Sequence, residues 1–352
     1  MLRGLNLIVM LAYMATVGRW PAAFADEPLA VDRLAAVAPA HIDVAHAPAP
    51  LYDDPVWHGA TDPYVIWMPG KGENHQGQWW MYYTQRRSTL ENPHGVDWVH
   101  GSAIGIATSA DGLHWKYAGV CQGDHHLADP VAANISWWAP CLLWDGGRLH
   151  MFVVLVHGIF TSWTGDRTIE HFTSNDGVNW QFVSTLKLSS MRCIDPMVLK
   201  IGDLWYIWYK DEAAGSHTWM AHSPDLNDWT VDKEVVGGHG HEAPFVWYWK
   251  GAYWLIVDAG RSLPVYRSES GTDHWVLNNT LLSGTEGKRP QDNRVGKHPA
   301  IVLQGDQCLI YYFTESNRRS VIQLAELTLD GDGKIQCDRN QYLATTPAPP
   351  QP

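Results

Sequence analysis

The chain has 352 residues with 37 acidic and 25 basic side chains, a formal net charge of −12 at pH 7. This acidic balance argues against nucleic acid and against anionic lipid as partners. Five cysteines at irregular spacing fit neither a small disulfide scaffold nor a zinc ribbon. Two of them, Cys308 and Cys337, can either form a disulfide in the last repeat or remain isolated buried thiols.

Residues 1–25 have the pattern of a secretory signal peptide. Arg3 gives the positive start, an apolar run extends from residue 5 to 17, and Ala23-Phe24-Ala25 is a small-x-small cleavage site. A membrane anchor is the alternative, but the run is too short and Arg19 follows it closely. We therefore expect a secreted or periplasmic protein that has no membrane contact after cleavage.

The rest of the chain divides into three parts. Residues 26–50 are rich in Ala and Pro and are predicted to form an N-terminal arm. A rhythm of strands and turns without helical periodicity occupies residues 51–340, and residues 341–352 are expected to be a disordered tail.

A short pattern recurs five times within residues 51–340: a proline preceded by one or two distinctive residues and followed by an apolar strand. The five prolines are Pro63, Pro140, Pro196, Pro244 and Pro299. Their spacing is close to the length of a propeller blade. The sequence therefore predicts an all-β fold, a five-bladed β-propeller with four strands in each blade.

A second pattern follows the proline pattern in the first four repeats. It is a tight turn that contains Asp, often as Asp-Gly, and it ends at a tryptophan. The four tryptophans are Trp115, Trp180, Trp229 and Trp275, and residues 330–333 carry a looser version. We expect these tryptophans to pack between neighbouring sheets.

Three of the residues beside the prolines are acidic, namely Asp62, Asp195 and Glu242, and a fourth is His298. The inner strands of a propeller begin at one end of its central channel, so these side chains should converge. Repulsion between three carboxylates raises the pKa of at least one, which provides an acid and a base at neutral pH. Cleavage of a glycosidic bond needs this pair. The alternative is that each Asp-Pro only starts a strand.

Aromatic and histidine residues add a weaker signal. Trp138 stands at an inner-strand entrance, where an indole face can stack on a sugar ring. His125-His126 and the pair His239 and His241 lack partners at the usual spacing of zinc ligands. We therefore expect no catalytic transition metal and no required cofactor.

The proline motifs resemble those of five-bladed β-propeller glycoside hydrolases, nearest to family 43. Family 117 is a relative, and the fructan-cleaving families 32 and 68 are more distant. The motifs are Thr61-Asp62-Pro63, Trp138-Ala139-Pro140, Ile194-Asp195-Pro196, Glu242-Ala243-Pro244 and Gly296-Lys297-His298. The resemblance implies that Asp62 is the general base, Asp195 tunes pKa and orientation, and Glu242 is the general acid. It also implies that His298 lies near a central water or a structural Ca²⁺ held through water.

The sequence departs from the family pattern at two places. Ala243 replaces the Gly that commonly follows the acid, and His239 and His241 crowd Glu242. Because a histidine has been proposed as the acid in family 117, Glu242 can instead be a binding residue. The run from Arg192 to Asp195 faintly resembles the Arg-Asp-Pro motif of fructan-cleaving propellers.

We expect an exported glycoside hydrolase that acts with inversion on a plant or algal oligosaccharide or polysaccharide. The residues expected to bind substrate are Trp138, Arg192, His239, His241 and His298. One alternative is a carbohydrate-binding propeller without catalysis. Another is a retaining glycosidase, a glycosyl transferase or a phosphorylase on the same fold.

Overall fold

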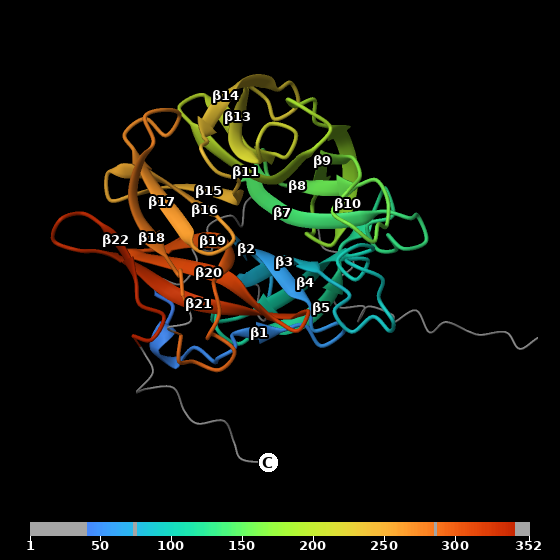
Figure 1. Cartoon of the computed structure of the whole chain (residues 1–352), viewed down its shortest axis with the longest axis horizontal. Helices are drawn as coiled ribbons and strands as arrows, with labels where there is room; N and C mark the ends of the chain where they lie inside the picture. Colours follow the sequence, from blue (N-terminus) through green and yellow to red (C-terminus); the bar gives the residue numbers. More distant parts are fainter. Residues whose placement is uncertain (1–40, 73–75, 285–286, 342–352) are drawn as a thin grey trace, which may run out of the picture.

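The computed structural model describes residues 41–72, 76–284 and 287–341, which form five antiparallel sheets arranged in a ring (Figure 1). The predicted all-β fold with five blades is confirmed. Among these residues no helix is long and apolar enough to cross a membrane. The expected signal peptide, residues 26–40 of the arm and residues 342–352 of the tail lie outside the described residues.

Each blade starts with its innermost strand and continues outward in chain order. The first blade contains β2 (Ala60–Met68), β3 (Gln78–Gln85), β4 (Ala103–Ser109) and β5 (Lys116–Val120). The second contains β7 (Ser136–Asp145), β8 (Arg148–Val156), β9 (Arg167–Ser174) and β10 (Asn179–Thr185). The third contains β11 (Cys193–Ile201), β12 (Leu204–Asp211), β13 (His217–Ser223) and β14 (Thr230–Val236). The fourth contains β15 (Glu242–Trp249), β16 (Ala252–Asp258), β17 (Leu263–Ser268) and β18 (Val276–Leu281).

The fifth blade closes the ring. It contains β19 (Lys297–Gln304), β20 (Gln307–Ser316) and β21 (Arg319–Leu329). Two strands share the outer edge of β21: β22 (Ile335–Cys337), and β1 (Tyr52–Asp53) from the start of the domain. The second sheet also gains a strand, because β6 (Gln122–Gly123) pairs with β10 in parallel. The expectation of four strands per blade is therefore wrong for the second and fifth sheets.

The last part of the arm packs on the fifth blade. A short 3-10 helix, η3 (Val44–His46), follows Ile42, and the Ile42 side chain is buried. The backbone N–H of Ile42 donates to Gln307 Oε1 at 2.8 Å, and Gln307 Nε2 donates back to the Ile42 carbonyl at 3.1 Å.

All five proline motifs form β-bulges in the innermost strands. The residue before each proline has left-handed φ: Asp62 at 52°, Ala139 at 46°, Asp195 at 55°, Ala243 at 52° and His298 at 43°. The register between first and second strands shifts at each of these positions. Such backbone costs a non-glycine residue of order 1–3 kcal/mol and is kept where surrounding structure enforces it, often at functional sites. The proline pattern that recurs in the sequence therefore marks one β-bulge in the innermost strand of each blade.

Bonds between blades hold three of the bulges. The N–H of Ala139 donates to Thr84 Oγ1 in the first blade at 2.8 Å. The N–H of Ala243 donates to Asp195 Oδ2 in the third blade at 2.9 Å. The fifth blade's bulge is held in the same way by a carboxylate of the fourth blade, described below.

Three of the four turn tryptophans pack against the preceding blade, as predicted. Trp115 meets Tyr311 edge to face, with ring centroids 6.4 Å apart. Trp180 meets Tyr82 at 6.1 Å. Trp229 meets Phe152 at 5.9 Å. Edge-to-face pairs of this kind add stability beyond the burial of area.

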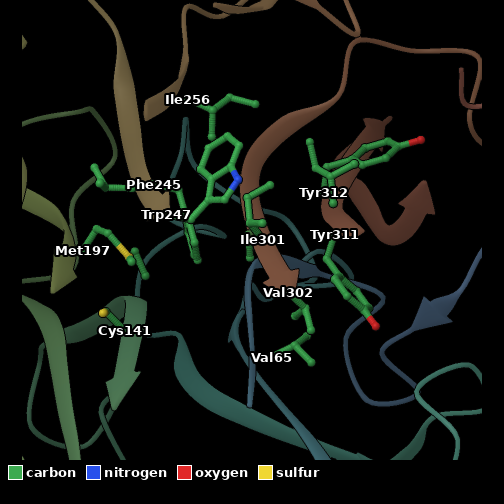
Figure 2. Close-up of a cluster of buried hydrophobic side chains, with 14 of the residues drawn as sticks. Val65, Cys141, Met197, Phe245, Trp247, Ile256, Ile301, Val302, Tyr311 and Tyr312 are labelled. Carbon is green, nitrogen blue, oxygen red and sulfur yellow. The ribbon is translucent and has the colours of Figure 1, made fainter. Parts of the chain in front are cut away.

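Apolar side chains of the innermost strands fill the centre of the ring (Figure 2). They are Val65, Cys141, Met197, Phe245 and Ile301, all buried. The five cysteines are all free thiols. Of the two possibilities for Cys308 and Cys337, the structure thus has separate thiols and no disulfide. Below the bulges the centre is thus a packed core, and polar side chains gather at the end where the innermost strands begin.

Candidate active site

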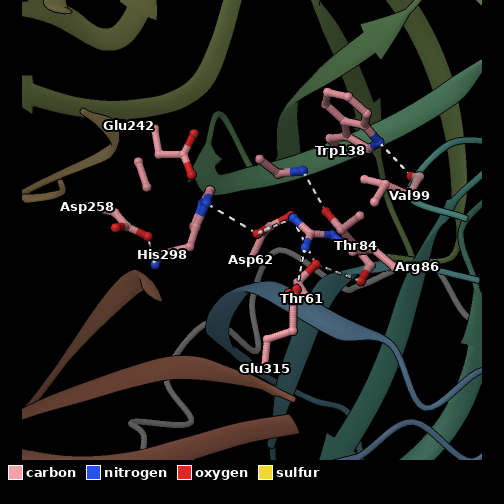
Figure 3. A network of polar contacts seen from close by, with 12 residues as sticks. Thr61, Asp62, Thr84, Arg86, Val99, Trp138, Glu242, Asp258, His298 and Glu315 are labelled. Atoms are coloured by element: carbon pink, nitrogen blue, oxygen red, sulfur yellow. Dashed lines mark hydrogen bonds and ion pairs between the residues drawn. The ribbon is translucent and has the colours of Figure 1, made fainter. Parts of the chain in front are cut away.

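Five residues of the proline motifs meet where the innermost strands begin, an end of the ring that we call the mouth. These residues are Asp62, Trp138, Asp195, Glu242 and His298, each from a different blade. Figure 3 shows the His298 side chain between Asp62 on one side and Glu242 and Asp258 on the other. The convergence expected from the repeat is therefore observed.

Asp62 is 5 % exposed, and its Oδ1 lies 3.3 Å from His298 Nδ1 and 3.9 Å from Arg86 Nη2. The Thr61 hydroxyl donates to Oδ2 at 3.2 Å. Burial opposes ionisation, but the neighbouring His298 and Arg86 and the hydroxyls of Thr84 and Thr61 together lower the pKa of Asp62 from its ordinary value. Asp62 is therefore ionised at neutral pH, as a general base must be.

Asp195 behaves in the opposite way. Its side chain is buried, and Oδ2 accepts the N–H of Ala243. Burial raises the pKa of Asp195, and Glu242 and Asp62 raise it further against the opposing effect of His298 and Lys210, to about 6. Asp195 therefore holds a proton under mildly acidic conditions.

Glu242 lies at the open side of the mouth, with a side chain 46 % exposed. Burial of its inner part opposes ionisation, but Lys210 Nζ donates to Oε2 at 3.1 Å, and Lys210 with His298 lowers the pKa of Glu242. The role expected for Asp195 was to tune the pKa of the general acid, so that Glu242 keeps its proton. Without substrate the reverse holds: Asp195 has the raised pKa and keeps the proton, whereas Glu242 is ionised because Lys210 stabilises its charge.

Asp258 is a fourth carboxylate of the mouth that the sequence reading missed. It is 2 % exposed and lies directly opposite Glu242 in the register of β15 and β16. Its Oδ2 accepts the N–H of His298 at 3.1 Å and its Oδ1 that of Gly260 at 2.7 Å. Burial and the charge of Glu242 raise the pKa of Asp258 to about 6.

Asp258 belongs to a set of charged residues at the ends of the second strands. In an antiparallel pair, the end of the second strand lies beside the start of the first. The set is Arg86, Lys210, Asp258 and Glu315. A charge at the end of an apolar strand, one strand after four of the five proline motifs, is a signal that could have found them.

Arg167, at the start of β9, is a further residue that the sequence reading missed. It is 1 % exposed, pairs with Glu212, and lies 5.3 Å above the ring centroid of Trp138. Burial and the neighbouring charge of Arg192 lower the pKa of Arg167 to about 10, although Asp195 and Glu242 oppose this. The guanidinium therefore adds a buried positive charge beside the carboxylates.

Two of the expected binding residues flank this group. Trp138 is 7 % exposed, and its Nε1 donates to the Val99 carbonyl at 3.1 Å. Arg192 is partly exposed, and its Nη2 donates to Glu212 Oε2 at 3.1 Å. Both therefore border the mouth, with the Trp138 Nε1 and the Arg192 Nη2 bonded to protein groups.

The two histidines near Glu242 differ in burial: His241 is buried and His239 is exposed. His241 is buried, and its Nε2 accepts the N–H of Thr218 at 3.0 Å, so its Nδ1 donates to the His239 carbonyl at 2.9 Å. Burial lowers the pKa of His241, which keeps this neutral form. His239 is exposed, and its ring centroid is 6.0 Å from that of His241. Neither ring nitrogen of His241 is thus left for a substrate.

The comparisons with known proteins rest on structure alone, because no protein-family model and no curated protein matches the sequence. A thermostable family-43 glycoside hydrolase superposes with a TM-score of 0.60 at 17 % identity, over 86 % of this chain and 98 % of that one. An exo-1,5-α-L-arabinanase from a bovine ruminal metagenomic library superposes with a TM-score of 0.54 at 14 % identity. The match covers 82 % of this chain and 99 % of that one.

A third similar structure is a family-43 β-xylosidase/α-arabinofuranosidase from a compost microbial metagenome, in complex with xylotriose and in a calcium-free form. It gives a TM-score of 0.56 at 16 % identity, over 79 % of this chain and 94 % of that one. The chain therefore has the five-bladed β-propeller fold of the family-43 glycoside hydrolases, at low sequence identity.

Proposed function

We propose that the protein is an exported glycoside hydrolase that cleaves plant or algal saccharides with inversion at the anomeric carbon. The similar folds suggest a xylan- or arabinan-type substrate. The observation that carries the proposal is the pairing, within one mouth, of an ionised Asp62 with carboxyl groups that keep a proton up to about pH 6. Export rests on the pattern of residues 1–25 and is tested by sequencing the N-terminus of the mature protein.

In this mechanism, Asp62 removes a proton from a water molecule that attacks the anomeric carbon. Glu242 donates a proton to the glycosidic oxygen as its bond to that carbon breaks. His298 and Arg86 lie beside Asp62 and hold its carboxylate in place. The free sugar then carries a hydroxyl on the face opposite the bond that was cleaved.

The proton that Glu242 donates is shared with its neighbours. Interacting carboxyl groups titrate as a set, so the form with the proton on Asp195 is in rapid equilibrium with the form protonated on Glu242. A bound sugar covers the exposed part of Glu242 and removes water from it, which disfavours its charge. Substrate binding therefore moves the proton toward Glu242.

The residues around His298 do not form a direct calcium site. Nδ1 of His298 faces Asp62, and no group of three or more His, Cys, Asp or Glu side chains in the described ranges is arranged to hold a metal ion. A calcium ion near His298 would take most of its ligands from water, as we proposed from the sequence. No step of the mechanism depends on it.

The pH dependence follows from these pKa shifts. The pKa of Asp62 is lowered from its ordinary value, so Asp62 stays ionised at neutral and mildly acidic pH, whereas Asp195 and Asp258 lose their protons at about pH 6. We expect kcat/KM to fall as the pH rises through about 6. The Asp258→Asn variant lacks a negative charge opposite Glu242, so the pKa of Glu242 falls. The alkaline limb of the pH profile, where kcat/KM falls with rising pH, should then move to lower pH. Initial rates between pH 3 and 9 test this, and a limb unchanged in the variant would contradict it.

The stereochemical outcome separates inversion from the retaining alternatives. With Asp62 as base, a water molecule lies between its carboxylate and the sugar, so the first product has the opposite anomeric configuration. NMR spectra recorded during the first minutes of hydrolysis show which anomer forms first. The same anomer as in the substrate would make Asp62 a nucleophile and favour a retaining mechanism.

The alternative of a propeller that only binds carbohydrate is tested by a substrate screen. Aryl glycosides of xylose, arabinofuranose and galactose, with plant and algal oligosaccharides, cover the sugars that we consider. Binding of an oligosaccharide without release of any product would favour the binding propeller.

A further inference from the structure

An exposed tryptophan stands beside the mouth, in the loop of residues 157–166 that joins β8 to β9. Trp163 has 56 % of its surface exposed, although burial of a tryptophan is strongly favourable. A single exposed apolar residue is common on protein surfaces and means little by itself. Its surroundings, however, distinguish Trp163.

The loop that carries Trp163 is tied down by packing and by a hydrogen bond to the first blade. The Phe160 ring packs against Gly158 and Gly165, and a Cβ atom at either glycine would collide with this ring. Both glycines have positive φ, at 156° and 103°. The Thr161 carbonyl accepts the N–H of Val96 at 3.0 Å, which ties the loop to the first blade. The indole of Trp163 is therefore carried on a loop that is braced on both sides.

The loop places Trp163 next to Trp138. Their ring centroids are 6.3 Å apart with the planes at 64°, so the edge of one indole meets the face of the other. Arg167 lies over the Trp138 ring at 5.3 Å, and Trp138 itself is 7 % exposed. Of the two indoles, Trp163 thus supplies the open aromatic surface.

A continuous row of contacts runs from this aromatic pair to Glu242. Arg167 pairs with Glu212, and Lys210 Nζ lies 3.6 Å from Glu212 Oε1 and 3.1 Å from Glu242 Oε2. A chain of contacts therefore links Trp163 and Trp138 to Glu242 at the mouth.

We propose that Trp163, supported by Trp138, binds a second sugar ring of the substrate, next to the ring that is cleaved from it. The apolar C–H face of a pyranose or furanose stacks on an exposed indole, and a braced loop lowers the entropic cost of binding. The preferred substrate is then an oligosaccharide rather than a single sugar on a small leaving group. This inference deepens the proposed function and rests on it.

The test compares two kinds of substrate in the wild-type protein and the Trp163→Ala variant. The substrates are xylotriose and arabinotriose, and the p-nitrophenyl glycosides of xylose and arabinofuranose. We expect Trp163→Ala to lower kcat/KM on the cleaved trisaccharide about tenfold, the effect of one lost aromatic contact, mainly through KM. Hydrolysis of the aryl glycoside should change less than twofold, and Trp163→Phe should restore most of the loss.

The matched control is Tyr248→Ala, which removes another exposed aromatic side chain at the far end of β15 from Glu242. This variant should behave as wild type on both substrates. Equal losses on both substrates in Trp163→Ala, or no loss on either, would overturn the subsite.

Calorimetric titration with xylotriose and arabinotriose separates this inference from the proposed function. If the wild-type protein binds a trisaccharide without cleaving it, the hydrolase proposal fails, and weaker binding by Trp163→Ala still supports the subsite. If the wild-type protein cleaves a trisaccharide and Trp163→Ala binds and cleaves it equally well, only the subsite fails.

Discussion

Glu242→Gln is expected to slow hydrolysis of an unactivated glycosidic bond about 10²- to 10⁴-fold, the usual contribution of a general acid. Gln keeps the volume of Glu and cannot donate the proton that the leaving oxygen needs. A p-nitrophenyl glycoside, whose leaving group departs without that proton, should lose much less. Measuring kcat/KM on both substrates for the wild type and the variant gives the difference directly.

The control for this prediction is His241→Ala. Both ring nitrogens of His241 bond to neighbouring protein groups, so its loss should lower stability without any dependence on the leaving group. If His241→Ala or His239→Ala shows that dependence while Glu242→Gln is nearly harmless, the acid is a histidine. Glu242 would then be a binding residue, as in the family 117 alternative.

Asp62→Asn is expected to reduce hydrolysis of both substrates together, by roughly the 10²- to 10⁴-fold that a general base contributes. Water must be activated whichever group leaves, so an activated aryl glycoside gains no protection. The loss should lie in kcat, because Asp62 acts on the attacking water. Asn also tolerates the left-handed φ of 52° at this position, so the bulge should be kept.

A buried aspartate whose side chain bonds to Tyr312 and Arg339, and not to the carboxylates or His298, provides the matched control. Asp292 is 0 % exposed and bonds to Tyr312 and Arg339 in the fifth blade. Asp292→Asn should lower the melting temperature while leaving kcat unchanged. If Asp62→Asn instead changes only KM, to a modest and equal extent on both substrates, Asp62 is a binding or structural residue.

The fold could be predicted because its signals are local. Each proline marks a bulge at the start of an innermost strand, and each Asp turn marks the connection between the third and fourth strands. The backbone requirements of a bulge and of a tight turn restrict which residues can stand there, so they leave a readable repeat. The repeat also predicted that Asp62, Asp195 and Glu242 come together, because the innermost strands of a propeller all begin at one end of the ring. Asp62 and Asp195 stand one residue before their prolines and Glu242 two residues before Pro244.

Only the tertiary structure decided the rest of the site. Asp258 and Arg86 stand one strand after a proline motif, and their roles depend on which blade lies beside them. Lys210 reverses the expected positions of charge and proton on Glu242 and Asp195, because a lysine of the third blade meets a carboxylate of the fourth. The pKa of a group depends on burial and on charges across blade boundaries, and a sequence repeat records neither. The role proposed for Trp163 likewise depends on a tertiary contact, because only the structure places its loop beside Trp138.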